Sequence, residues 1–258
     1  MRKRPSLIAG LAVAVSTAIA ASVAFADPIV SGNDGNTQSV DVALAPKKLS
    51  KTALTPVTLK VTTKTGTTTA ANGVPNPATR ATVDFDRNAK LFTKGIPTCE
   101  AAQLQSTSTE AALAACGDAK IGSGAGMALL PVGAQVFPEP TVITAFNGVP
   151  QGRKPVVLLH TYGSAPVQTT LVLVGTVSNY GKEGYGPRLD VAIPPLAGGT
   201  GALTDFQVTI NKKFTYKGKK RSFISAKCST KKLKARGTFT YQDGEALTAY
   251  STQSCSQR

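Results

Sequence analysis

The chain has 258 residues, with 29 Lys and Arg against 14 Asp and Glu, four Cys and no Trp. This length suits one large domain or two small β domains, and it is enough to bury a core that does not depend on cross-links. With no Trp, six Tyr and nine Phe, the composition argues against a sugar-binding surface built on flat aromatic platforms.

The first 26 residues have the three-part pattern of a secretory signal peptide. Arg2, Lys3 and Arg4 precede an apolar run over residues 7–23, and Ala24-Phe25-Ala26 supplies the small residues of a cleavage site. The alternative, an N-terminal membrane anchor, is disfavoured because the run is short for a span and no basic stop follows it. We therefore expect cleavage after Ala26 and a mature chain, without a membrane span, that is secreted to the extracellular space or the cell envelope.

Residues 27–51 are polar and mixed, and we predict a lead-in there to a single β domain over residues 52–258. Within the lead-in, Val40, Val42 and Leu44 alternate with other residues and allow a short strand. Residues 57–62 and 82–86 alternate apolar and polar side chains, which is the period of a half-buried strand.

The period changes after Pro97. Thr98 can cap a short helix that reaches Leu104, and Thr107 with Glu110 matches a capping box that opens a second helix. Gly117 supplies the stop of that helix. We predict a small helical insertion at residues 98–117.

The four cysteines are expected to form disulfides, because an even number in an exported chain favours pairing. Four cysteines allow three pairings. Cys99 and Cys116 bracket two helices that are too short to be stable alone, so we predict that they pair. Cys228 would then pair with Cys255 and tie its strand to the last strand. No spacing matches the short pair of a zinc site, and no metal is expected.

Beyond Gly117 the chain alternates short strand candidates with turn signals, among them Asn147-Gly148 and Asp243-Gly244. The strand candidates are residues 135–137, 141–146, 155–162, 169–177, 188–193, 206–210, 222–227, 238–241 and 246–252. No amphipathic helices alternate with them, which favours an all-β fold, an antiparallel β-sandwich, over a parallel α/β sheet.

Two motifs partly match known ligand-binding loops, one for calcium and one for a dinucleotide, but each lacks required features. Residues 84–88 resemble the start of a calcium loop, but Ala89 and Gly95 stand where the loop needs Gly and a bidentate Glu. Residues 122–126 contain the GxG of a dinucleotide loop, but a helix precedes them and strands follow. We interpret this segment as a tight turn or a close backbone approach, and we expect no cofactor.

A hydrolase would have to use His160, the one histidine of the chain, or an acid/base pair among the carboxylates. His160 sits in a strand pattern without a nucleophile turn, and the spacing of the carboxylates selects no pair. We therefore predict no catalytic residue. Tyr180 and Tyr185 flank a glycine-rich turn and are either a binding tip or ordinary strand-end tyrosines.

The strongest functional candidate is a basic segment at residues 212–236, which contains eleven cations and no acid. Removal of the signal takes away three of the 29 basic residues, so 26 remain against 14 acids, a net charge of +12. Such a cluster attracts anionic partners, although it also suits a merely solvated surface. The predicted polyanion-binding residues are Lys212, Lys213, Lys217, Lys219, Lys220, Arg221, Lys231, Lys232, Lys234 and Arg236, and Lys227 lies among them.

The basic segment is interleaved with Phe214, Tyr216 and Phe223, and cations with aromatic rings suit an anionic polymer. The pattern does not distinguish nucleic acid, teichoic acid, acidic polysaccharide and lipid headgroups. We expect Lys219, Lys220 and Arg221 at a hairpin tip. A strand of about seven residues, roughly 20 Å, would then separate them from the next basic connection.

Several stretches resemble a group of secreted actinobacterial proteins that have no assigned activity. The resembling stretches are residues 83–86, 95–99, 121–124, 145–148, 218–220, 225–228 and 239–244, together with Cys116. The resemblance implies an exported β-rich domain and carries no catalytic residue to this chain. The sequence thus predicts a non-catalytic exported or cell-envelope protein that binds an anionic polymer or polysaccharide. The alternative is a secreted hydrolase with an unrecognised site.

Overall fold

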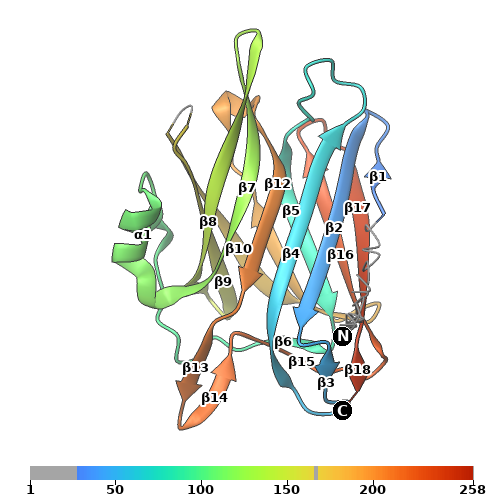
Figure 1. Cartoon of the computed structure of the whole chain (residues 1–258), viewed down its shortest axis with the longest axis vertical. Coiled ribbons are helices and arrows are strands. Elements are labelled where there is room, and N and C mark those ends of the chain that lie inside the picture. The colour runs from blue at the N-terminus through green and yellow to red at the C-terminus, as the bar shows by residue number, and fades with distance from the viewer. Residues whose placement is uncertain (1–27, 166–167, 258) are drawn as a thin grey trace, which may run out of the picture.

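The computed structural model describes residues 28–165 and 168–257, and the predicted signal peptide lies outside them. The described chain forms one antiparallel sheet that curves until its first and last long strands lie side by side (Figure 1). The strands of this ring, in the order in which they pair, are β2 (Asn36–Ala45), β4 (Thr55–Thr67), β12 (Ala202–Ile210), β7 (Lys120–Val132), β8 (Gln135–Gln151), β9 (Lys154–Gly163), β10 (Thr169–Asn179), β11 (Tyr185–Ala192), β5 (Ala78–Asp86), β16 (Lys232–Tyr241) and β17 (Ala246–Ser254).

Short strands decorate the ring. They are β1 (Val30–Ser31) on β2, β6 (Ala89–Leu91) and β15 (Ile224–Ala226) at the start of β4, the parallel pair β3 (Lys48–Leu49) and β18 (Ser256–Gln257), and the hairpin β13 (Lys213–Tyr216) and β14 (Lys219–Ser222).

Side chains close the ring between β17 and β2. The Ser251 hydroxyl accepts a hydrogen bond from the Val42 N–H at 3.0 Å. The Gln253 amide accepts from the Leu44 N–H at 2.5 Å and donates to the Leu44 carbonyl at 2.8 Å. The predicted all-β, antiparallel class is confirmed, but the sheet is near-closed and barrel-like rather than a clear sandwich. The pairs β4–β12 and β5–β16 join distant parts of the chain, which local alternation cannot reveal.

Alternating burial along the strands builds the core inside the ring. Val40, Val42 and Leu44 of β2 are buried, while their neighbours are exposed or half-buried. This strand lies within residues 27–51, which were predicted to be a polar lead-in. In the structure, residues 36–45 are one of the long strands of the barrel. Polar outward side chains, such as Asp41, explain why the segment has a low apolar content.

A second core lies outside the sheet, under the helical insertion. The insertion consists of the 3-10 helix η1 (Ala101–Leu104), α1 (Thr109–Cys116) and the 3-10 helix η2 (Gly117–Ala119). Leu104 and Ala112 pack on Phe146, Leu158 and Val172 of the barrel wall. The predicted helical insertion is present, but helical turns continue past Gly117 to Ala119. Ser108 caps α1, with its Oγ 3.2 Å from the Ala111 N–H. The Thr107 hydroxyl donates to the Leu104 carbonyl instead.

Both predicted disulfides are present. Cys99 pairs with Cys116 beside the helices, and Cys228 pairs with Cys255 at one end of the barrel. The glycine-rich segment at residues 122–126 lies in β7 and is a close backbone approach: a Cβ on Gly124 would lie 1.8 Å from the Gln207 carbonyl oxygen of β12. The nucleotide-loop pattern therefore has a packing origin.

Candidate functional site

One end of the barrel, which we call the basic end, collects the predicted anion-binding residues. Strands β2, β5, β8, β10 and β12 run toward this end and their successors start from it, so alternate connections of the chain meet there. It is the lower end of the barrel in Figure 1, where the β13–β14 hairpin and β15 also lie.

The β13–β14 hairpin carries the densest group of cations. Lys213, Lys217, Lys219, Lys220 and Arg221 are all exposed on it. The tip is Lys217-Gly218, whose φ values of 51° and 71° form the left-handed turn that suits a two-residue hairpin. The predicted position of residues 219–221 at the tip is therefore wrong, because they pair in β14 with residues 214–216 of β13.

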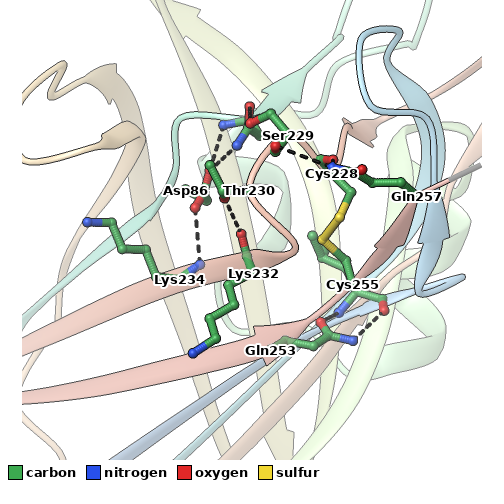
Figure 2. Close-up of a disulfide and its surroundings, with 11 residues drawn as sticks. Asp86, Cys228, Ser229, Thr230, Lys232, Lys234, Gln253, Cys255 and Gln257 are labelled. Atoms are coloured by element: carbon green, nitrogen blue, oxygen red, sulfur yellow. Dashed lines mark hydrogen bonds between the residues drawn. A yellow bond between two sulfur atoms is a disulfide. The ribbon is translucent and has the colours of Figure 1, made fainter.

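The second group, Lys231 and Lys232, lies where the connection from β15 enters β16. Both are exposed, and Figure 2 shows the Lys232 side chain extending away from the Cys228–Cys255 disulfide. The strand between the two groups is only three residues long, Ile224–Ala226, which is roughly 10 Å instead of the predicted 20 Å. Since β15 lies across the basic end, the two groups share that end.

Further exposed cations, which lie outside the basic segment, join the same end. They are Lys47, Lys48, Lys51, Arg87, Lys90, Lys94, Arg153, Lys154 and Lys182. They are scattered in sequence and form no run. Their common location could have been predicted from the strand order. Every second connection between antiparallel strands lies at the same end of the sheet, and these residues lie in or beside such connections.

Three of the predicted residues are engaged in internal contacts. The Lys212 ammonium donates to the Asp118 carbonyl at 3.2 Å, and the Lys234 ammonium donates to the Glu183 carbonyl at 2.5 Å. Arg236 pairs with Asp84 at 2.8 Å and with Glu183 at 2.6 Å. These contacts tie the three side chains to neighbouring elements of the barrel wall.

Asp84 is the centre of a buried ion network. Its carboxylate is 2 % exposed and also accepts from Arg188 at 2.6 Å. Burial opposes ionisation, but the hydrogen bonds and charges of Arg188 and Arg236 outweigh it and hold the pKa of Asp84 below its ordinary value. Asp84, whose carboxylate lies in the segment that resembles a calcium loop, is thus the ion-pair partner of two arginines.

Tyr180 and Tyr185 belong to the same network. The Arg188 guanidinium lies 3.9 Å from the centre of the Tyr180 ring, and Arg236 lies 4.8 Å from that of Tyr185. Tyr185 is buried. The two rings stack on internal arginines, so they do not form a free binding tip.

The aromatic residues of the basic segment hold the hairpin to the barrel. Phe214 and Tyr216 pack against Phe92, with ring centres 5.9 Å and 5.6 Å apart, and Phe223 is buried. The Arg221 guanidinium lies 5.0 Å from the centre of the Phe92 ring. These rings support the cations and are not a stacking platform for bases.

Hydrogen bonds and a disulfide fix the second connection (Figure 2). The buried Asp86 carboxylate accepts from the Asn88 amide at 2.9 Å and from the Lys234 N–H at 3.2 Å. Ser229 donates to Asn88 at 3.0 Å, and Gln257 donates to the Cys228 carbonyl at 2.9 Å. The lysines of this connection therefore project from a braced loop.

The opposite end, which we call the acidic end, carries Asp34, Asp190, Asp205, Asp243 and Glu245. The cations near it, Lys64 and Arg80, pair with Asp205 and Asp190. Among the described residues, only Asp34, Asp243 and Glu245 bring three carboxylates within 4.8 Å of one another, close enough to share a cation. Exposed carboxylates often gather in this way without an ion.

His160 is fully buried on the outer face of β9, beneath the helical insertion. Its Nε2 lies 3.0 Å from the Thr107 carbonyl oxygen and 3.1 Å from the Thr107 hydroxyl. Burial lowers its pKa below the ordinary value. This is the predicted strand histidine with a local hydrogen bond, and it gives no support to a hydrolase that depends on it.

Comparison of the chain with protein-family models, curated proteins and solved structures found no match. The resemblance to secreted actinobacterial proteins therefore stays a prediction. No helix in the described ranges is both long and apolar enough to cross a membrane.

Proposed function

We propose that the protein is an exported, non-catalytic binding protein whose basic end holds an anionic polymer. One observation carries the proposal: exposed cations from several separate connections gather at one end of the barrel, although they are scattered in the sequence. None of Lys213, Lys217, Lys219, Lys220 and Lys232 forms an ion pair with another described residue. Clustered charge of one sign attracts a polyanion and speeds its association.

The favoured partner is an envelope polymer or acidic polysaccharide, recognised by its charge. The aromatic rings of the segment are committed to the hairpin–barrel contact, which disfavours base stacking as the mode of binding. Because both basic groups share one end, a chain that crosses only this end can contact them together.

The test is the affinity for linear polyphosphate and heparin fragments of increasing length, measured at low and at moderate salt. We expect affinity to grow with length and to fall as salt rises. Changing Lys219, Lys220 and Arg221 together to Ser should flatten the slope of log affinity against log salt by about 2 to 3, since each lost contact removes about 0.7–0.9.

A matched control removes the same charge elsewhere, by changing Lys60, Lys64 and Arg80 to Ser. This control should keep most of the wild-type affinity. Absence of binding at low salt, or equal losses in the two triple variants, would show that the basic end is only a solvated surface.

Export is supported by the signal pattern of residues 1–26 and by the two disulfides, which form and persist in oxidising compartments. The intact mass of the exported protein tests it. We expect a chain that begins at Asp27, and an exported species that still carries residues 1–26 would contradict the cleavage site.

A further inference from the structure

The interior of the barrel is hollow. A cavity of about 170 Å³ lies inside the ring, and its lining is almost wholly apolar. Ala81, Phe85 and Leu189 point into this cavity and are only partly buried, although the sheet surrounds them. The ring contains more strands than the roughly eight whose side chains just fill a barrel, so space at its centre is the physical consequence.

The cavity is long and narrow. Strand β5 lines it from Ala78 near the acidic end to Asp86 near the basic end, and eight steps along a strand span roughly 25 Å. The volume is close to the roughly 150 Å³ of compact apolar cavities that take up a small hydrocarbon. Spread over this greater length, it suits one extended hydrocarbon chain.

The cavity is closed at the basic end and opens at the acidic end. At the basic end, the buried Phe223 and Ile224 line it, and they belong to the same core cluster as the Cys228–Cys255 disulfide. At the acidic end, the connection from β11 to β12 crosses the mouth, because these strands lie on opposite sides of the ring. Pro194 and Pro195 of this connection line the cavity and are exposed.

The mouth also defines the polar head of the ligand. Its polar lining side chains are uncharged, with Thr63 and Gln242 among them. Among the described residues, the carboxylates of this end outnumber its two cations, Lys64 and Arg80, which pair with Asp205 and Asp190. An anionic head would therefore meet a net negative charge. At the closed end, the Lys234 ammonium donates to the Glu183 carbonyl and lies 4.5 Å from the centre of the Tyr185 ring, and neither Glu183 nor Tyr185 lines the cavity.

From this geometry we propose that the barrel binds a neutral single-chain amphiphile, such as a long-chain alcohol or monoacylglycerol. Its hydrocarbon chain would lie along the cavity and its uncharged head at the acidic end. The site is separate from the basic end, so it does not depend on the function proposed above.

The test uses the full mature chain and displacement of a naphthylamine fluorophore by straight-chain alcohols from octanol to hexadecanol. Affinity should rise about fourfold per added methylene until the chain fills the cavity. The alcohols should bind at least about tenfold more tightly than carboxylates of equal length at neutral pH, which corresponds to about 1.4 kcal/mol. No displacement at any length, or affinity independent of length, would show that the cavity is only a packing void.

Two matched pairs of variants locate the chain and the head. Ala81→Phe fills the cavity and should abolish binding, whereas Thr82→Phe, on the outer face of the same strand, should not. Ile193→Arg adds a cation at the mouth and should favour carboxylates, whereas Val132→Arg adds one elsewhere at the acidic end. Thermal unfolding of each variant reports whether it is folded. Equal effects within each pair, in folded variants, would overturn the proposed position of the ligand.

Discussion

The two ends of the barrel differ in charge and also in how they are fastened. The basic end is held by a disulfide, by the Asp84 ion network and by the Phe92 aromatic contacts. The connection across the acidic end is held to the β16–β17 turn by a hydrogen bond from the exposed Gln242 amide to the Gly199 carbonyl at 2.8 Å. The comparison teaches that the end that gathers like charges is tied down by covalent, ionic and aromatic contacts, whereas the connection over the proposed mouth is fastened by a surface hydrogen bond.

The largest expected effect comes from the disulfide of the basic end. Changing Cys228 and Cys255 together to Ala should lower the free energy of unfolding by about 3–4 kcal/mol, because the bond closes a long loop in the unfolded chain. Hydrogen exchange should also accelerate in residues 227–232 more than in the remaining barrel.

The second disulfide is the matched control for this prediction. Changing Cys99 and Cys116 to Ala should cost about 3 kcal/mol and leave exchange in residues 227–232 close to that of the wild type, after correction for global stability. Equal local acceleration in both double variants would mean that the disulfide does not brace the basic end.

The next effect concerns the ion network. Asp84→Asn leaves Arg188 and Arg236 without their shared carboxylate, and broken buried pairs cost about 3–5 kcal/mol. Both arginines keep some exposure, 29 % and 16 % of their side chains, so we expect about 2–3 kcal/mol at neutral pH. Denaturant unfolding of the variant and the wild type measures this cost.

The cost of Asp84→Asn should depend on pH. The folded-state pKa of Asp84 is lowered, so its stabilisation is complete above the unfolded value of about 3.9 and disappears as the pH falls through the folded value. The difference between wild type and variant should therefore be largest near pH 7 and shrink steadily below about pH 4. A difference that stays constant down to pH 2 would show that lost packing, and not lost charge, sets the cost.

The smallest effect is expected at the acidic end. Gln242→Ala removes the bond to Gly199 at an exposed site, and it should lower the free energy of unfolding by about 0.5 kcal/mol. Hydrogen exchange in residues 194–201 should nevertheless rise, since this bond fastens the connection across the mouth. Gln135→Ala, at an exposed position of the same end, is the control and should change neither quantity. Unchanged exchange in the Gln242 variant would mean that other contacts hold the connection closed.

Local patterns predicted the parts of the fold that depend on local forces. Alternation of apolar and polar side chains located β5, β9 and β10. The two helices are too short to be stable alone, which predicted the disulfide between Cys99 and Cys116. The same reasoning missed most of β7, because Gly122, Gly124 and Gly126 suggest a turn. Their real cause is the backbone of β12, which approaches from a segment some eighty residues away.

The candidate site was predicted only in part for a similar reason. The run at residues 212–236 was visible, but Arg236 and Lys234 are used internally, which depends on Asp84 and Glu183 from distant strands. Lys90 and Lys154 reach the basic end only through the strand order. The cavity had no local sequence signal, because it depends on the number of strands in the ring and on which inward side chains the strand order brings face to face.

The seam between β2 and β17 has a consequence for how the chain reaches its final state. It joins the first long strand to the last one, and it is made by the Ser251 and Gln253 side chains in place of a backbone ladder. The ring cannot close until the end of the chain has emerged, and pairing of such distant strands is intrinsically slow. Until the last strand has been made, the edge of β2 beyond its short pairing with β1 therefore lacks its β17 partner, and the barrel stays open.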